Sequence, residues 1–161
     1  MPNTQAIGVA FADPEFQSVA VTGAVSAASA SVTGAVSAGS VSATSVSGTT
    51  VTASGSLVIK SATVAAAGST QGNAAAVTAG FTLVTAADGT KGVVLPAASA
   101  GLVVIIKNAD AANAILKVYP ASGDAINALA ANASYDMAAK TSMLLVAYDA
   151  TTWYTVPLLA S

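Results

Sequence analysis

Four valines recur at a strict spacing of five residues, and no other feature of the sequence constrains the fold as strongly. Each valine is followed by Ser or Thr and then by Ala or Gly; the four are Val36, Val41, Val46 and Val51. A spacing of five matches neither the 3.6-residue period of an α-helix nor the two-residue period of a β-strand. Ser, Thr, Gly and Val are also mediocre or poor helix formers. The pattern therefore predicts short extended pieces alternating with turns, as in a β-helical or interwoven β stalk.

A single copy of this stalk has too little apolar surface to hold itself in shape. Burial of one valine contributes about 1.5–3 kcal/mol, whereas ordering the backbone of five residues costs about 1–2 kcal/mol for each residue. Disorder would favour charged residues and proline over evenly spaced valines. We therefore expect an intertwined homotrimer whose stalk core is Val36, Val41, Val46 and Val51, the number three resting on analogy. A monomeric solenoid of the pentapeptide type is the structural alternative.

The composition excludes several classes of function. The chain has 161 residues, 54% of them hydrophobic but mostly Ala and Val, and only 7% are charged. No apolar run approaches the ~18 residues of a membrane-spanning helix, so we expect no membrane contact. His and Cys are absent, which removes imidazole and thiolate metal ligands and nucleophilic catalysis by Ser-His or Cys-His pairs. The five cations are scattered lysines, which argues against a nucleic-acid partner.

Changes in composition divide the chain into four segments. We expect an anchoring arm at residues 1–20, the repetitive stalk at 21–59, a small-residue linker at 60–79 and a C-terminal domain at 80–161. The arm is not repetitive and combines two aromatic residues with two prolines and the only local charges. Such an isolated group predicts docking onto another molecule, with a frayed terminus as the alternative. The residues expected to form the anchor are Phe11, Asp13, Pro14 and Phe16.

The C-terminal segment reads as an all-β domain. Short apolar runs alternate with turn residues at 81–84, 92–96, 101–108 and 114–120, and Asp88-Gly89 is a strong turn signal after the first run. A final hairpin is expected from 142–149 and 151–159. These runs predict an antiparallel β-sandwich or small barrel that holds most of the large side chains.

Little in the sequence indicates chemistry. Most of the seven carboxylates lie in predicted turns, where Asp accepts local hydrogen bonds, so we expect no catalytic residues, no metal and no cofactor. Residues 86–93 superficially resemble a phosphate loop but lack its spacing. Trp153 and Tyr154 are neighbours on a strand and point to opposite faces, so one of them covers a core or subunit interface. The other is a candidate platform for stacking on a sugar, and the full set of candidate exposed aromatics is Tyr119, Tyr135, Trp153 and Tyr154.

Part of the sequence resembles a known family. The stretch GVVLPAASAGLVVIIKNADAANAILKVYPASGDAIN, followed by SMLLVAYDATTWYTV, is similar to a β-domain that recurs in virion proteins of tailed bacteriophages. The VTGAVSA repeats look like the stalks that precede such domains. The resemblance implies a homotrimer on the capsid exterior, bound to the major capsid protein by its N-terminal segment.

The short stalk favours a capsid decoration (cement) protein or a short head fibre over a long tail fibre. The alternative is a tail-fibre tip that binds a receptor or glycan. An enzyme would need a carboxylate pair formed between subunits.

Overall fold

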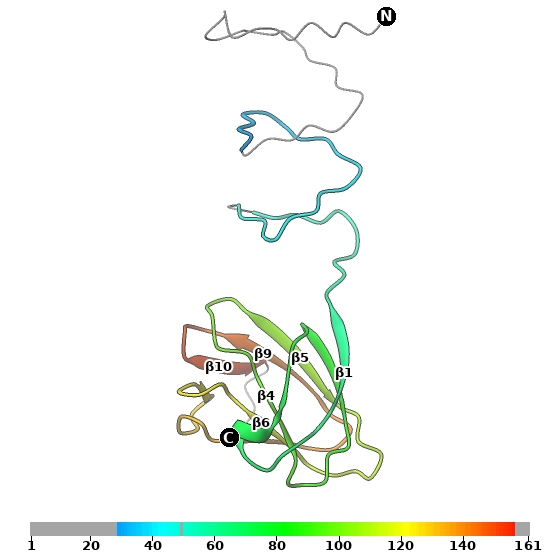
Figure 1. The fold of residues 1–161 in the computed structure, drawn as a ribbon, viewed down its shortest axis with the longest axis vertical. Helices are drawn as coiled ribbons and strands as arrows, with labels where there is room; N and C mark the ends of the chain where they lie inside the picture. Colours follow the sequence, from blue (N-terminus) through cyan, green and yellow to red (C-terminus); the bar gives the residue numbers. More distant parts are fainter. Residues whose placement is uncertain (1–28, 49, 157–161) are drawn as a thin grey trace, which may run out of the picture. The chain divides into compact units, whose positions relative to one another are not determined.

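The computed structural model describes residues 29–48 and 50–156, and the chain divides into two compact units, Met1–Val51 and Thr52–Ser161. In the first unit, the described residues form neither strand nor helix. In the second unit, the chain from Ser61 onward forms two β-sheets and one short 3-10 helix (Figure 1). No helix in the described ranges is long and apolar enough to cross a membrane.

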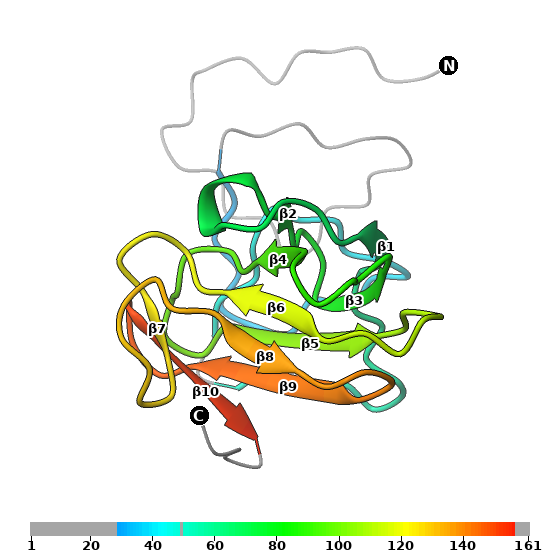
Figure 2. The same ribbon diagram turned by 90° about the horizontal axis from the view of Figure 1, so that it is seen from below.

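The larger sheet has six strands in the order β1-β3-β5-β9-β10-β7. Their bounds are β1 Ser61–Ala65, β3 Phe81–Thr85, β5 Val103–Asn108, β9 Ser142–Ala147, β10 Thr152–Val156 and β7 Ala125–Ile126. The smaller sheet has the order β2-β4-β6-β8. Its strands are β2 Ala75–Ala76, β4 Gly92–Val94, β6 Leu116–Tyr119 and β8 Tyr135–Met137, and the 3-10 helix η1 is Gln71–Asn73. Figure 2 shows β4, β6 and β8 as one layer next to β3, β5 and β9.

The first six strands coil as a β-solenoid. The chain alternates between the sheets, so β1, β3 and β5 stack in parallel in the larger sheet while β2, β4 and β6 stack in parallel in the smaller one. The register places Ser61 beside Phe81 and Phe81 beside Ile105, one residue per turn of the coil. The result is a solenoid of about four turns, which confirms the all-β class and the presence of a β-helical element. The element lies at 61–119, whereas the sequence placed it at 21–59.

The last strands close this coil with antiparallel pairs. β9 pairs antiparallel with β5, β10 with β9, and β8 with β6. The predicted final hairpin is confirmed, because the Tyr148 amide donates to the Thr152 carbonyl across the turn at Asp149. The chain thus changes from parallel stacking to antiparallel pairing about halfway along the domain.

Three sequence predictions need correction. Five of the eight ladders among the described residues are parallel, so the domain is a two-sheet sandwich but not an antiparallel one. The runs at 81–84 and 92–96 do not form a hairpin: the Asp88-Gly89 turn exists, but it carries the chain from one sheet to the other. The segment 60–79 is not a linker, because β1, η1 and β2 lie in it. Side-chain alternation identifies a strand but not its neighbour, which is why the pairing was missed.

The hydrophobic core lies between the two sheets. Its largest fully buried side chains include Trp153 on β10, Ile106 on β5, Leu116 on β6 and Leu145 on β9. Asn108 at the end of β5 is also fully buried, and its Nδ2 donates to the carbonyls of Ala114, Met137 and Ala138. Through these three bonds the buried asparagine satisfies its own polar amide and ties the larger sheet to the strand ends of the smaller one.

Candidate functional site

The outward side of the six-stranded sheet is largely apolar, and Val103, Tyr154 and Val156 on it are exposed. Along β3, β5, β9 and β10 every second residue is buried against the smaller sheet, while the residues between them are half-buried or exposed. Eight of these outward residues are apolar or aromatic, and the other four are polar: Phe81, Leu83, Val103, Ile105, Leu144, Val146, Tyr154 and Val156 against Thr85, Lys107, Ser142 and Thr152. Strands that are apolar on both sides are typical of sheets covered on both faces. We call this set of eight residues the outer face.

Cross-strand register joins the outer face into continuous rows. One row runs across five strands through Ser61, Phe81, Ile105, Leu144 and Val156. A second row, formed by Val103, Val146 and Tyr154, lies beside it. Directly opposed side chains on one face of an antiparallel pair have Cβ atoms about 4.5–5.5 Å apart. The outer face is therefore one contiguous patch and not a scatter of single residues.

Charge is almost absent from this patch. The third row contains Leu83, Lys107 and Ser142, and Lys107 is the only charged residue in the three rows. Its ammonium group donates to the backbone carbonyl of Lys140 in the same chain. The outer side of the smaller sheet differs, because Lys117 on β6 and Asp136 on β8 form a cross-strand ion pair at 2.8 Å. The two sheets of the domain thus present surfaces of unlike polarity.

The segment that leads into β1 extends the apolar surface. Leu57 and Val58 are 79% and 90% exposed, and Ile59 is also largely open to solvent. The chain then joins the sheet at once, since the Lys60 carbonyl accepts a hydrogen bond from the Phe81 amide. Three consecutive large aliphatic side chains in water are unfavourable, because burial of each would contribute roughly 1.5–3 kcal/mol of stabilising free energy.

The stalk valines are exposed in the single chain. Val36, Val41, Val46 and Val51 are between 68% and 72% exposed. Their proposed role as a core between chains stays a prediction. The four anchor residues Phe11, Asp13, Pro14 and Phe16 lie outside the described residues.

Two of the four candidate aromatics are wrong as exposed contact residues. Trp153 is fully buried, and Tyr119 is buried with its hydroxyl donating to the Ser69 carbonyl at 2.9 Å. Tyr135 packs partly against the core. Tyr154 is exposed, and its ring meets that of Tyr148 edge-on at a centroid distance of 6.0 Å. Tyr148 was not among the candidates, although its position just before the Asp149 turn of a predicted hairpin could have indicated an exposed site.

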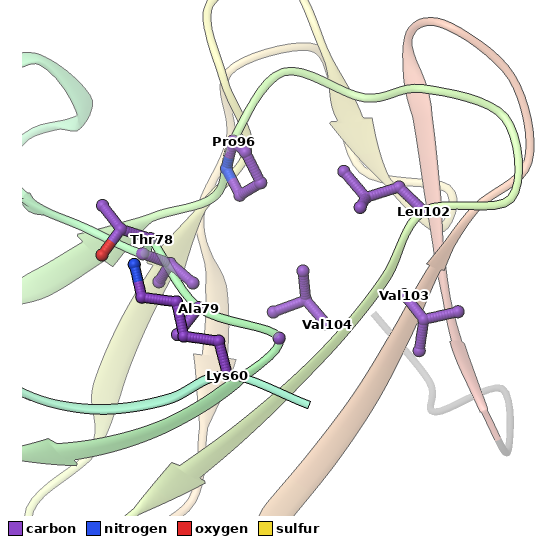
Figure 3. Close-up of a pocket in the computed structure, with 9 residues that line it drawn as sticks. Lys60, Thr78, Ala79, Pro96, Leu102, Val103 and Val104 are labelled. Carbon is purple, nitrogen blue, oxygen red and sulfur yellow. The ribbon is translucent and has the colours of Figure 1, made fainter. Parts of the chain in front are cut away.

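One pocket among the described residues is apolar and has a volume of about 280 Å³. It lies where the chain enters the larger sheet, and Figure 3 shows Lys60, Pro96 and Leu102 around it with Val104 at its base. The side chains of Lys60 and Thr78 are its only polar ones. No acid lines the pocket, so it lacks the paired titratable groups that acid-base chemistry requires.

The carboxylates have structural roles. The Asp149 carboxylate accepts hydrogen bonds from the Thr151 and Thr152 amides, and the Thr151 bond is the main cause of its lowered pKa. The pKa of Asp88 is lowered well below its usual range, chiefly by the Thr90 hydroxyl and then by the Lys91 amide. These bonds confirm the predicted turn roles.

Two further carboxylates are buried. Asp124 accepts the Ala98 amide at 2.9 Å, and Asp110 accepts the Ala114 amide at 3.1 Å. Within the described ranges, no three acidic side chains gather as a metal site.

Comparison of the chain with family models, curated proteins and solved structures finds no match. The functional argument therefore depends on the surfaces described above.

Proposed function

We propose that this chain is a structural virion protein, a homotrimeric capsid decoration (cement) protein or short head fibre. In this proposal the N-terminal arm binds the major capsid protein, and the protein lies on the capsid exterior. The observation that carries the proposal is the exposure of the period-five valines, at 68–72% in a single chain. A regular apolar pattern with no cover among the described residues is best explained by copies of the same chain.

The mechanism would be mass action without catalysis. A protein that binds the assembled shell and not its separated subunits stabilises the shell by RT ln(1 + [L]/Kd). Three arms on one trimer would act together, because binding of the first raises the effective concentration of the others. Even weak docking of Phe11 and Phe16 would then give stable attachment.

Deletion of residues 2–18 tests the proposal. We expect the truncated protein to keep the number of subunits of the full-length oligomer, as measured by light scattering. We also expect it to be absent from purified capsids. A matched variant, Phe11→Ala with Phe16→Ala, should bind capsids more weakly while keeping its fold. Normal decoration by the truncated protein, or full-length protein located on the tail by labelled imaging, would contradict the assignment.

The exposed pair of Tyr148 and Tyr154 supports a second candidate, a receptor- or glycan-binding tip. Tyr148 is 72% exposed, and two tyrosines at one edge of a sheet offer an apolar face with hydroxyl groups beside it. Sugar binding on a glycan array that is lost in Tyr148→Ala and kept in Tyr135→Phe would favour this function. Absence of binding to any glycan would remove it.

A further inference from the structure

The outer face of the six-stranded sheet needs a cover, and its chemistry restricts what that cover is. Its eight residues are all apolar or aromatic, and the one cation in the adjoining row, Lys107, is occupied within its own chain. Sugars and nucleic acids need hydrogen-bonding or cationic partners, and the Tyr154 hydroxyl is the one such side-chain group among the eight residues. Charge-poor, apolar surfaces are instead typical of permanent interfaces between identical subunits.

We infer that the outer face is the surface through which one copy of the domain packs against a second copy of this chain. This inference rests on the homo-oligomer of the proposed function and names the surface involved. The apolar rows start at Ser61 in β1, and Leu57, Val58 and Ile59 directly before it are exposed. The valine stalk and the outer face are therefore joined along the chain by further uncovered aliphatic residues.

The area of the outer face indicates what this face and the valine stalk would each contribute to assembly. Four strands about 4.8 Å apart with five residues of about 3.4 Å each cover roughly 300 Å² in projection. A stable interface buries about 800 Å² on each partner. The outer face alone is too small to bring free copies together. It suffices once the stalk holds the copies close, since the second contact is then made within one assembly.

The absence of cysteine provides a clean test of this inference in the full-length protein. Val103 in the outer face and Ile115 just before β6 are both 45% exposed in the single chain. Two single-cysteine variants, Val103→Cys and Ile115→Cys, therefore form a matched pair. The measurement is the rate of maleimide alkylation in native buffer and in denaturant, with the oligomer mass measured by light scattering on the same samples.

We expect Val103→Cys to react about tenfold more slowly than Ile115→Cys in native buffer, because a thiol between copies reacts only when they separate. The two rates should become equal in denaturant. Equal native rates in an oligomeric sample would overturn the outer face as the interface and leave the proposed function standing. A monomeric sample would overturn both. Protection of Val103→Cys in an oligomer that never binds capsids would support the interface and remove the virion function.

Discussion

Valine occupies two contrasting environments in this chain. In the first unit Val36, Val41 and Val46 project from a backbone without strands and remain about 70% exposed. In the second unit Val84, Val93 and Val118 are fully buried between two sheets. The side chain is the same, so the difference comes from the neighbours: the buried valines lie on strands whose partners satisfy the backbone and shield the face.

The contrast shows that spacing decides where burial can occur. A two-residue period turns one face of a strand toward a partner sheet of the same chain. A five-residue period places one valine in each repeat. Among the described residues of a single chain, these valines have no second sheet to pack against. The domain therefore contains its own core, whereas under the proposed function the stalk takes its core from other chains. The predictions below test this separation, and they are ordered by the expected change in the stability of the domain.

The largest effect is expected from Trp153, which is fully buried on β10. Trp153→Ala should lower the free energy of unfolding by about 3–5 kcal/mol, because it leaves a large cavity between the sheets. Trp153→Phe should cost much less. It keeps an aromatic ring and removes an indole N–H that has no hydrogen-bond partner among the described residues. Chemical denaturation followed by circular dichroism measures both, and equal losses would place Trp153 outside a well-packed core.

A smaller loss is expected at Gly68, which has a φ of +58° before the 3-10 helix. A Cβ at this position would overlap the side chain and backbone of Asn73, so Gly68→Ala should cost about 1–3 kcal/mol. Gly72 has open space around it, and Gly72→Ala should change stability by no more than about 1 kcal/mol. Thermal unfolding compares the two. A neutral Gly68→Ala would mean that 60–79 behaves as the linker first expected.

Acid should weaken the domain and spare the stalk. Hydrogen bonds to the folded form lower the pKa of Asp88 and Asp149, so both contribute stability above their unfolded pKa of about 4 and lose it as the pH falls further. No charged residue lies between Glu15 and Lys60, so stalk assembly has no such dependence. Melting temperatures measured from about pH 2 to about pH 7 should fall at acid pH for the wild type. In an Asp88→Asn, Asp149→Asn variant they should depend less on pH.

The smallest change in domain stability is expected from the stalk valines. Replacing Val36, Val41, Val46 and Val51 by Ala should leave unfolding of the domain within about 0.5 kcal/mol of the wild type. The same variant should dissociate at a lower denaturant concentration, measured by light scattering. A large loss of domain stability, or an unchanged dissociation midpoint, would show that the stalk valines are not a core between chains.

Several features could be predicted from local sequence because they depend on local physics. Short apolar runs at 81–84 and 142–149 predicted strands, and Asp88 and Asp149 predicted turns that their carboxylates cap. The interpretation that one of Trp153 and Tyr154 covers the core is likewise confirmed, and the buried one is Trp153. The apolar outer face could have been recognised from VVII and MLLV, since such runs lack the polar alternation of a half-solvated strand.

By itself, then, the sequence determined the all-β class, the positions of most strands, the turns and the uncharged, evenly spaced stalk. Only the tertiary structure decided that β1, β3 and β5 stack in parallel, that Tyr119 and Trp153 point inward, and that eight apolar side chains gather on one outer face. The reason is physical: a strand's own residues set its period and its two faces. Its neighbours are chosen by hydrogen bonds to segments 20 or more residues away, which no local pattern specifies.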